Sequence, residues 1–308
     1  MHRTIEVTVP PAYTDVLLHE LEQLEDVINL SVVRGVSVKP PGDVLTVHAL
    51  NRGADQVMSL ADAAREHGEV SVSTAELTSL VDPKQEHKVA NDVDEALWEE
   101  AETGLRHQGR ITSNFLTLMG MGGAIAATGF MVEATPQTIA FVSASIIAPG
   151  FEPLAKIPVG LALRRWSVVR RGLWSVGVGY LVLMISAALA FLLLRLTGVV
   201  AVDEFLGNSQ VEELTNPTLR EILVSACAAV AGITMVVAYR FSVLAGPLMA
   251  LVLIPAAAMI GVALASGRPD LMYEGVMRLG LDILLVVLAG VLVVLLKQAL
   301  FHRRAPMV

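Results

Sequence analysis

The chain has 308 residues, of which 54% are hydrophobic and 17% are charged, and its formal net charge is −8. These proportions exclude an ordinary soluble enzyme, in which about 25% of residues are charged, and they exclude a disordered or fibrous protein. The charge is uneven, because residues 1–110 hold 9 basic and 20 acidic side chains whereas residues 111–308 hold 13 and 10. We therefore expect a polar, acidic domain joined to an apolar, mildly basic one.

Residues 1–80 show the pattern of two small β–α–β units. Ile5, Val7 and Val9 alternate with polar residues, which is typical of a half-buried strand. The same reasoning predicts a helix over 13–24, a helix over 55–67 with Asp55 as a candidate N-cap, and strands over 27–38, 44–50 and 69–77. The order β-α-β-β-α-β predicts a ferredoxin-like soluble domain, a fold that often serves as a small-molecule sensor or an oligomerisation module.

Residues 81–110 are predicted to form a polar connecting helix. Val89, Val93, Leu97 and Leu105 fall on a narrow stripe that packs either on the N-terminal domain or on a second chain. The chain begins without an apolar signal segment, so we expect this half in the cytoplasm. Its acidic balance argues against a nucleic-acid partner, because a phosphate-binding face needs clustered Lys and Arg.

Residues 111–301 are predicted to form a transmembrane domain, followed by a basic cytoplasmic tail over 302–308. A helix needs about 20 apolar residues to cross a bilayer. Six segments qualify: 115–132, 136–163, 172–194, 222–239, 241–265 and 279–296. Glycine-rich faces in the first and third segments favour close helix packing and make a homo-oligomer plausible. The single cysteine, Cys227, excludes an internal disulfide, and its apolar neighbours predict that it is buried.

Basic residues indicate how these segments are oriented. With the N-terminal domain in the cytoplasm, the inner flanks hold ten Lys and Arg and the outer flanks hold four. We therefore expect a multi-pass protein of the prokaryotic cytoplasmic (inner) membrane, in contact with the lipid bilayer and with both termini cytoplasmic. The segment RRWSVVRR is interpreted as a topology determinant at the lipid headgroups, with a specific anionic-lipid site as the alternative; its arginines are Arg164, Arg165, Arg170 and Arg171.

The second apolar segment is interrupted by residues that weaken or remove helical hydrogen bonds, namely Pro149, Gly150, Pro153 and Pro158. Lipid cannot satisfy the backbone groups that such residues leave free. We therefore expect a break that faces the bundle interior or an aqueous cavity. The segment 136–163 either crosses the membrane once or is re-entrant.

Two ionisable residues, Glu152 and Lys156, lie beside the expected break. Their i, i+4 spacing places them on one face of a helix, where pairing lowers the cost of inserting both charges. Two interpretations stay open. The residues either line a substrate or ion pathway, or form a buried ion pair that fixes helix packing.

The fifth apolar segment offers a parallel to this break. It carries Pro247 and Pro255, and its LIPAAAMIGVALA faintly resembles IIAPGFEPLAKIPVGLAL. The six spans are therefore candidates for two inverted halves of three, as in many secondary transporters. Asp282 lies near the start of the sixth segment, where a simple interfacial carboxylate is favoured over an intramembrane proton carrier.

The chain also resembles a known family. After a glycine-rich first span come Thr135 and Pro136, then the stretch IIAPGFEPLAKIPVGLALRR and a later GP…LIP span. This pattern is similar to the prokaryotic "uncharacterised hydrophobic domain" family, domain of unknown function 389, over roughly residues 110–265. The chain departs from the family pattern at Gly150, Phe151 and Glu152, where many members have a leucine–methionine–glycine turn. The resemblance implies an architecture but no settled activity.

A polytopic bundle without a catalytic constellation favours transport. We expect a transporter or channel for an unidentified small solute or ion, with a regulatory cytoplasmic domain. The alternative is a membrane-anchored sensor or scaffold whose soluble domain binds a small molecule or protein partner. The spans hold no HExxH motif, no paired aspartates and no Ser–His combination, so we expect no enzyme activity, cofactor or metal.

Overall fold

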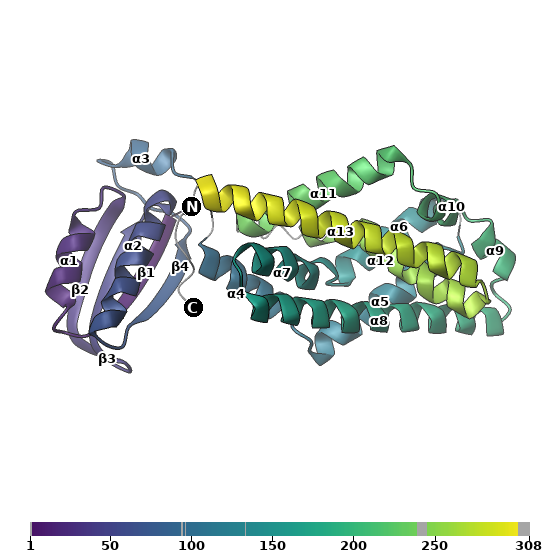
Figure 1. Ribbon diagram of the computed structural model, residues 1–308, viewed down its shortest axis with the longest axis horizontal. Coiled ribbons are helices and arrows are strands. Elements are labelled where there is room, and N and C mark those ends of the chain that lie inside the picture. The colour runs from purple at the N-terminus through teal and green to yellow at the C-terminus, as the bar shows by residue number, and fades with distance from the viewer. Residues whose placement is uncertain (1, 94, 96, 133, 239–244, 301–308) are drawn as a thin grey trace. The chain divides into compact units, whose positions relative to one another are not determined.

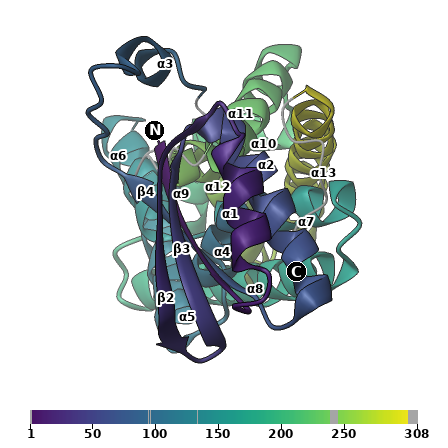
Figure 2. The ribbon, with the colours of Figure 1, turned by 90° about the vertical axis from the view of Figure 1, so that its left-hand side faces the viewer.

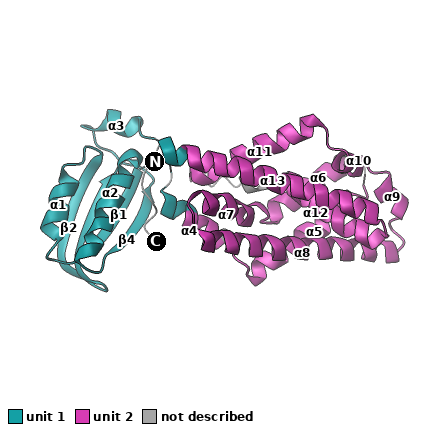
Figure 3. Ribbon diagram, viewed as in Figure 1, with its two compact units in different colours: residues 1–101, 297–308 teal, residues 102–296 magenta. Residues whose placement is uncertain are grey.

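The computed structural model describes residues 2–93, 95, 97–132, 134–238 and 245–300. The chain divides into two compact units, one formed by residues 1–101 and 297–308 and the other by residues 102–296 (Figure 3). The predicted domain boundaries at residues 80, 110 and 301 stay predictions, and the predicted tail 302–308 lies outside the described residues.

The first unit contains a four-stranded antiparallel sheet in the order β2-β3-β1-β4. Along the chain its elements are β1(His2–Val9), α1(Thr14–Glu22), β2(Val27–Val38), β3(Pro41–Ala49), α2(Asn51–Ala63), the 3-10 turn η1(Ala64–His67) and β4(Ser71–Leu77). The predicted order β-α-β-β-α-β is therefore present. Helices α1 and α2 cover the same face of the sheet (Figures 1 and 2).

The sheet and its two helices enclose one apolar core, because the strand residues alternate as predicted. Ile5, Val7 and Val9 are at most 1% exposed, whereas Glu6 between them is exposed. Leu17 of α1 and other apolar side chains of both helices complete the same cluster. Burial of this face is the dominant favourable contribution to the stability of such a domain.

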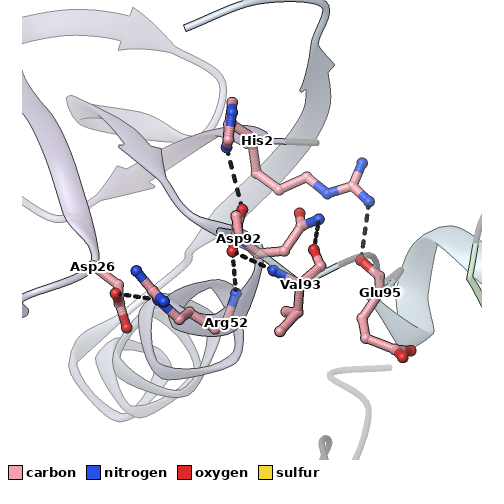
Figure 4. A network of polar contacts seen from close by, with 8 residues as sticks. His2, Asp26, Arg52, Asp92, Val93 and Glu95 are labelled. Atoms are coloured by element: carbon pink, nitrogen blue, oxygen red, sulfur yellow. Dashed lines mark hydrogen bonds and ion pairs between the residues drawn. The ribbon is translucent and has the colours of Figure 1, made fainter. Parts of the chain in front are cut away.

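Helix α2 begins four residues before the predicted N-cap, Asp55. Its N-cap is Leu50, whose side chain makes no capping hydrogen bond. The carboxylate of Asp92 replaces it: Oδ2 accepts from the backbone N–H of Asn51 at 2.7 Å, and Oδ1 accepts from that of Arg52 at 3.4 Å (Figure 4). The prediction that Asp55 caps this helix was wrong. The capping carboxylate comes from a distant part of the chain, and a local sequence pattern cannot show such a contact.

The connecting segment forms two helices, α3(Glu86–Ala90) and α4(Trp98–Gln108), so the prediction of one helix was wrong. Between them, the backbone carbonyl of Val93 accepts a hydrogen bond from Asn51 Nδ2 at 2.8 Å (Figure 4). A continuous helix would use that carbonyl internally. Leu97 joins the apolar core of the sheet, so this member of the predicted stripe packs on its own domain.

The last turn of the C-terminal helix also belongs to the first unit. That helix is α13(Pro269–Leu300), and the ammonium of Lys297 donates to Oε2 of Glu95 at 2.5 Å. Both side chains are largely buried, with 13% and 11% of their surface exposed. Two residues that lie 202 positions apart in the chain therefore meet in one unit.

The second unit is helical. After the end of α4 it contains α5(Ser113–Gly129), α6(Ala134–Ile147), α7(Phe151–Ala162), α8(Trp166–Leu196), α9(Val202–Leu206), α10(Ser209–Thr215), α11(Leu219–Val237), α12(Ala245–Ser266) and most of α13. Among the described residues, three helices are long and apolar enough to cross a membrane: α8, α11 and α13. The bent pair α6–α7 gives a fourth if it is counted as one span. Six crossings stay a prediction.

Cys227 lies on α11 and is exposed, so the prediction that it is buried was wrong. The buried face of this helix is formed by residues such as Ser225 and Ala229. Cys227 lies two positions from each of them, which places it on the opposite side of the helix.

Glycines bring α5 and α12 close to the backbone of α8. A Cβ added at Gly123 of α5 would lie 2.3 Å from the carbonyl oxygen of Leu183, and one at Gly261 of α12 would lie 2.1 Å from that of Met184. Such separations leave no room for a side chain. Gly123 therefore has the packing role that the glycine-rich first span predicts.

Candidate functional site

The predicted interruption of the second apolar segment separates α6 from α7, and the two helices are bent by 56°. The break falls at residues 148–150 and therefore contains Pro149. Pro153 lies in the first turn of α7, where a missing N–H leaves no helical bond unmade. Pro158 lies inside α7. Of the three prolines, only Pro149 marks the break.

The break lies in the interior of the bundle, as predicted. Phe151 and Leu154 are at most 1% exposed. The hydroxyl of Tyr180 on α8 donates to the carbonyl of Gly150 at 3.3 Å, and the N–H of Gly150 donates to the carbonyl of Ala148 at 2.8 Å. Protein groups thus satisfy backbone atoms that the break leaves free, which lipid could not do.

Glu152 and Lys156 do not form the buried ion pair that was one of the two interpretations left open. Lys156 is 4% exposed, and its ammonium donates instead to the backbone carbonyl of Gly109 at 2.6 Å. Glu152 is partly buried, and its Oε2 has no hydrogen-bond partner within the described part of the chain. The i, i+4 spacing was a correct guide to proximity along α7. It could not show that the chain before α5 supplies an acceptor to Lys156.

The structure places Asp282 inside the bundle, and its location at the membrane interface stays a prediction. Helix α13 begins at Pro269 rather than at residue 279, and Asp282 is 2% exposed. Its Oδ2 accepts from Nε of Arg278 at 3.0 Å, and Nη2 of Arg278 donates to the hydroxyl of Ser225 on α11 at 3.2 Å. Oδ1 of Asp282 and Nη1 of Arg278 are buried and find no hydrogen-bond partner among the described residues.

Tyr180 interacts with both the break and this ion pair. Its side chain is 3% exposed, and its hydroxyl interacts electrostatically with the carboxylates of both Glu152 and Asp282. We call the five residues Glu152, Tyr180, Ser225, Arg278 and Asp282 the buried polar cluster. Sequence reasoning missed Tyr180, Ser225 and Arg278. The i, i+4 spacing of Arg278 and Asp282 was the signal that could have shown the ion pair.

The four arginines of RRWSVVRR have different surroundings. Arg165 donates from Nη1 to Oε2 of Glu102 on α4 at 2.6 Å. Arg164 and Arg170 are exposed, and Arg171 lines a cavity with Lys156. Arg164 also has a φ of 55°, at a C-terminal cap of α7 in which the N–H of Arg165 bonds the carbonyl of Gly160.

The described part of the fifth predicted span, residues 245–265, lies in one helix without a break. Pro255 lies inside the continuous helix α12, and Pro247 lies in its first turn, with a side chain outside the described residues. Leu253 and Ala256, on either side of Pro255, are fully buried. A helix enclosed by protein tolerates a proline, because neighbouring groups satisfy the freed carbonyl. The correspondence between the two proline-bearing spans therefore stays a prediction, without a second break in the described residues 245–266.

The arrangement offers ionisable and hydroxyl groups rather than a metal centre. Within the residues that the structure describes, no group of three or more His, Cys, Asp or Glu side chains could hold a metal ion. The buried polar cluster combines two carboxylates, a guanidinium and two hydroxyls. Such a set can hold an ion or a polar solute by hydrogen bonds and charge.

Comparison with known proteins bears on this part of the chain. Residues 146–288 match the family model described as Domain of unknown function (DUF389). No curated protein and no solved structure matches the chain. The matched residues contain the break and the whole buried polar cluster. The chain therefore carries a DUF389 domain over residues 146–288, which confirms the resemblance that the segment around Pro149 indicates.

Proposed function

We propose that the protein is a transporter or channel that moves a small solute or ion across the prokaryotic cytoplasmic membrane. The buried polar cluster carries this proposal. An ionised side chain at the centre of a membrane helix costs at least ~2.5–3.5 kcal/mol to insert, so such a residue is a functional candidate by default. Asp282 and Arg278 are 2% and 6% exposed, and both lie on α13, a helix long and apolar enough to cross a membrane.

The cluster keeps polar atoms available for a ligand. Oδ1 of Asp282, Nη1 of Arg278 and Oε2 of Glu152 are without hydrogen-bond partners in the described structure. A buried ion pair that served packing alone would gain from satisfying these atoms, since each unmade hydrogen bond costs about 1–3 kcal/mol. Two acceptors and one donor therefore suit water, an ion or a polar solute.

The broken helix supports the same function. In many transporters, discontinuous helices border the substrate site, because unwound backbone can contact a solute. Here the hydroxyl of Tyr180 donates to the carbonyl of Gly150 in the break and also interacts electrostatically with the two carboxylates of the cluster. A change in the α6–α7 bend would therefore alter the cluster.

The proposal includes a membrane topology and a regulatory domain. It places six spans in the bilayer, both termini in the cytoplasm and the protein in a homo-oligomer. The strand order β2-β3-β1-β4, with both helices on one face, supports a ferredoxin-like fold for the cytoplasmic domain. In this proposal the protein is not an enzyme, and the domain modulates flux through the bundle.

The test is flux into proteoliposomes that contain the full chain, across protons, sodium, potassium, chloride and small carboxylates. Asp282→Asn is expected to lower flux of the transported species by about tenfold or more, because it removes a charge that the pathway uses. Asp270→Asn is the matched control, since Asp270 lies on the same helix in an exposed pair with Arg268. It should leave flux unchanged.

Two results would count against transport. The first is no flux of any of these species by protein that is folded in the liposomes. The second is unchanged flux in Asp282→Asn. A charge-reversed pair, Arg278→Asp with Asp282→Arg, separates a packing role of the ion pair from a role in contacting the solute. If the pair only stabilises packing, the double variant folds and restores flux. If the carboxylate itself contacts the solute, the double variant folds but flux stays impaired.

A further inference from the structure

The second unit contains a cavity of about 520 Å³, distinct from the buried polar cluster. Its wall is formed by the end of α4, the residues that lead into α5, Lys156 of α7 and the first turns of α8. The cations on this wall are Arg106, Arg110, Lys156 and Arg171. We call this the basic cavity.

The one carboxylate on the wall, Glu102, does not balance these charges. Its Oε1 accepts from Nη2 of Arg106 at 2.9 Å, and its Oε2 accepts from Nη1 of Arg165 at 2.6 Å. The two guanidinium groups thus use both oxygens of this carboxylate, which is buried with 5% of its surface exposed. The basic cavity therefore keeps an excess of positive charge.

The structure holds two of these cations close together. Lys156 is 4% exposed and fixed by its bond to Gly109, and Arg171 lies close enough for the two positive charges to repel. A Cβ at Gly172 would lie 3.0 Å from Cβ of Lys156, so α8 packs directly against the stem of this lysine. In the part of the chain described, Arg110 and Arg171 form no ion pair. Like charges held around an open cavity are stabilised by a bound anion.

We propose that the basic cavity binds a phosphate-bearing anion, either the phosphate of an anionic lipid headgroup or a soluble phosphate. Guanidinium groups match phosphate oxygens with paired hydrogen bonds, and lysine adds a point charge. Trp174 is 69% exposed and lines the same cavity, which gives the site an apolar border. This inference goes beyond the proposed function, since none of its residues belongs to the buried polar cluster.

Binding is measured on the full chain in phosphatidylcholine nanodiscs, by tryptophan fluorescence and by the thermal midpoint. In one arm inorganic phosphate is titrated against chloride at equal ionic strength. In the other, phosphatidylglycerol replaces phosphatidylcholine in increasing fractions. A saturable response in the first arm identifies a soluble phosphate, and one in the second arm alone identifies a lipid headgroup.

Arg171→Gln is expected to weaken the response by about tenfold or more, because it removes a charge-assisted contact. Arg170→Gln is the matched control: Arg170 is the adjacent exposed arginine and does not line the cavity. It should change the affinity less than twofold. Arg110→Gln is a second test in case Arg171→Gln does not fold.

The inference is overturned if neither probe gives a saturable response, or if Arg170→Gln weakens binding as much as Arg171→Gln, which would indicate attraction by net charge alone. These outcomes are independent of transport. A chain that moves no solute can still bind phosphate here, and a chain that binds no phosphate can still transport.

Discussion

Gly261 of α12 allows the sharpest test of how the helices pack. A Cβ at this position would lie 2.1 Å from the carbonyl oxygen of Met184, where ordinary contact begins at 3.4 Å. The neighbour is backbone, so α12 and α8 must separate to accept Gly261→Ala. Overpacking costs about 1–3 kcal/mol, and the higher helix propensity of alanine offsets about 1 kcal/mol. Because the neighbour is backbone, we take the upper end of the overpacking cost, about 3 kcal/mol, and expect a net loss of stability of about 2 kcal/mol after the gain in helix propensity.

Gly177→Ala on α8 is the matched control, because no atom lies within 4 Å of its added Cβ. Here only the propensity effect remains, so stability should rise by up to about 1 kcal/mol. The assay is thermal unfolding of the purified full chain in detergent, followed by tryptophan fluorescence. At about 2–4 °C per kcal/mol, Gly261→Ala lowers the midpoint by roughly 4–8 °C. Equal midpoints for the two variants would refute the close approach of α12 to α8.

Three further predictions concern charged groups. Asp92→Ala removes the cap of α2 and should cost about 1–2 kcal/mol in denaturant unfolding; an unchanged midpoint would show that water replaces the carboxylate. The Gly35 N–H, 2.7 Å from the carboxylate of Asp43, holds the pKa of Asp43 below its usual value. The Asp43 carboxylate therefore stabilises the fold at pH values above the usual aspartate pKa, and this contribution is lost as the pH falls through the lower folded-state pKa. In a pH series of unfolding midpoints, Asp43→Asn should lose less stability on acidification than the unchanged chain. Arg278→Ala and Asp282→Ala should each cost about 3–5 kcal/mol and the double variant less than their sum; additive costs in the same assay would argue against the pair.

Local patterns predicted the strands and helices of the first unit. The alternation of Ile5, Val7 and Val9 depends on neighbours two positions apart, so the sequence alone indicates which face is buried. The range 27–38 was correct for β2 for the same reason. The cap of α2 was not predictable, because Asp92 reaches Asn51 across 41 positions.

In the helical unit, the break was predictable and its chemistry was not. Pro149 cannot donate a backbone hydrogen bond wherever it stands, so its effect is visible in the sequence. The partner of Lys156 is a backbone carbonyl, which every residue has, and no side-chain pattern could indicate Gly109. Asp282 was assigned to an interface because the apolar run begins at residue 279, but α13 includes the polar turns before it.

The contact between Glu95 and Lys297 has a consequence for the parity of membrane crossings. An ion pair of 2.5 Å cannot bridge a hydrocarbon core about 30 Å thick. In a bilayer, both residues therefore lie on one side, and the chain between them crosses an even number of times. Crossings by α8, α11 and α13 alone would be odd. Either the bent pair α6–α7 is a full crossing, or an odd number of other helices must cross as well.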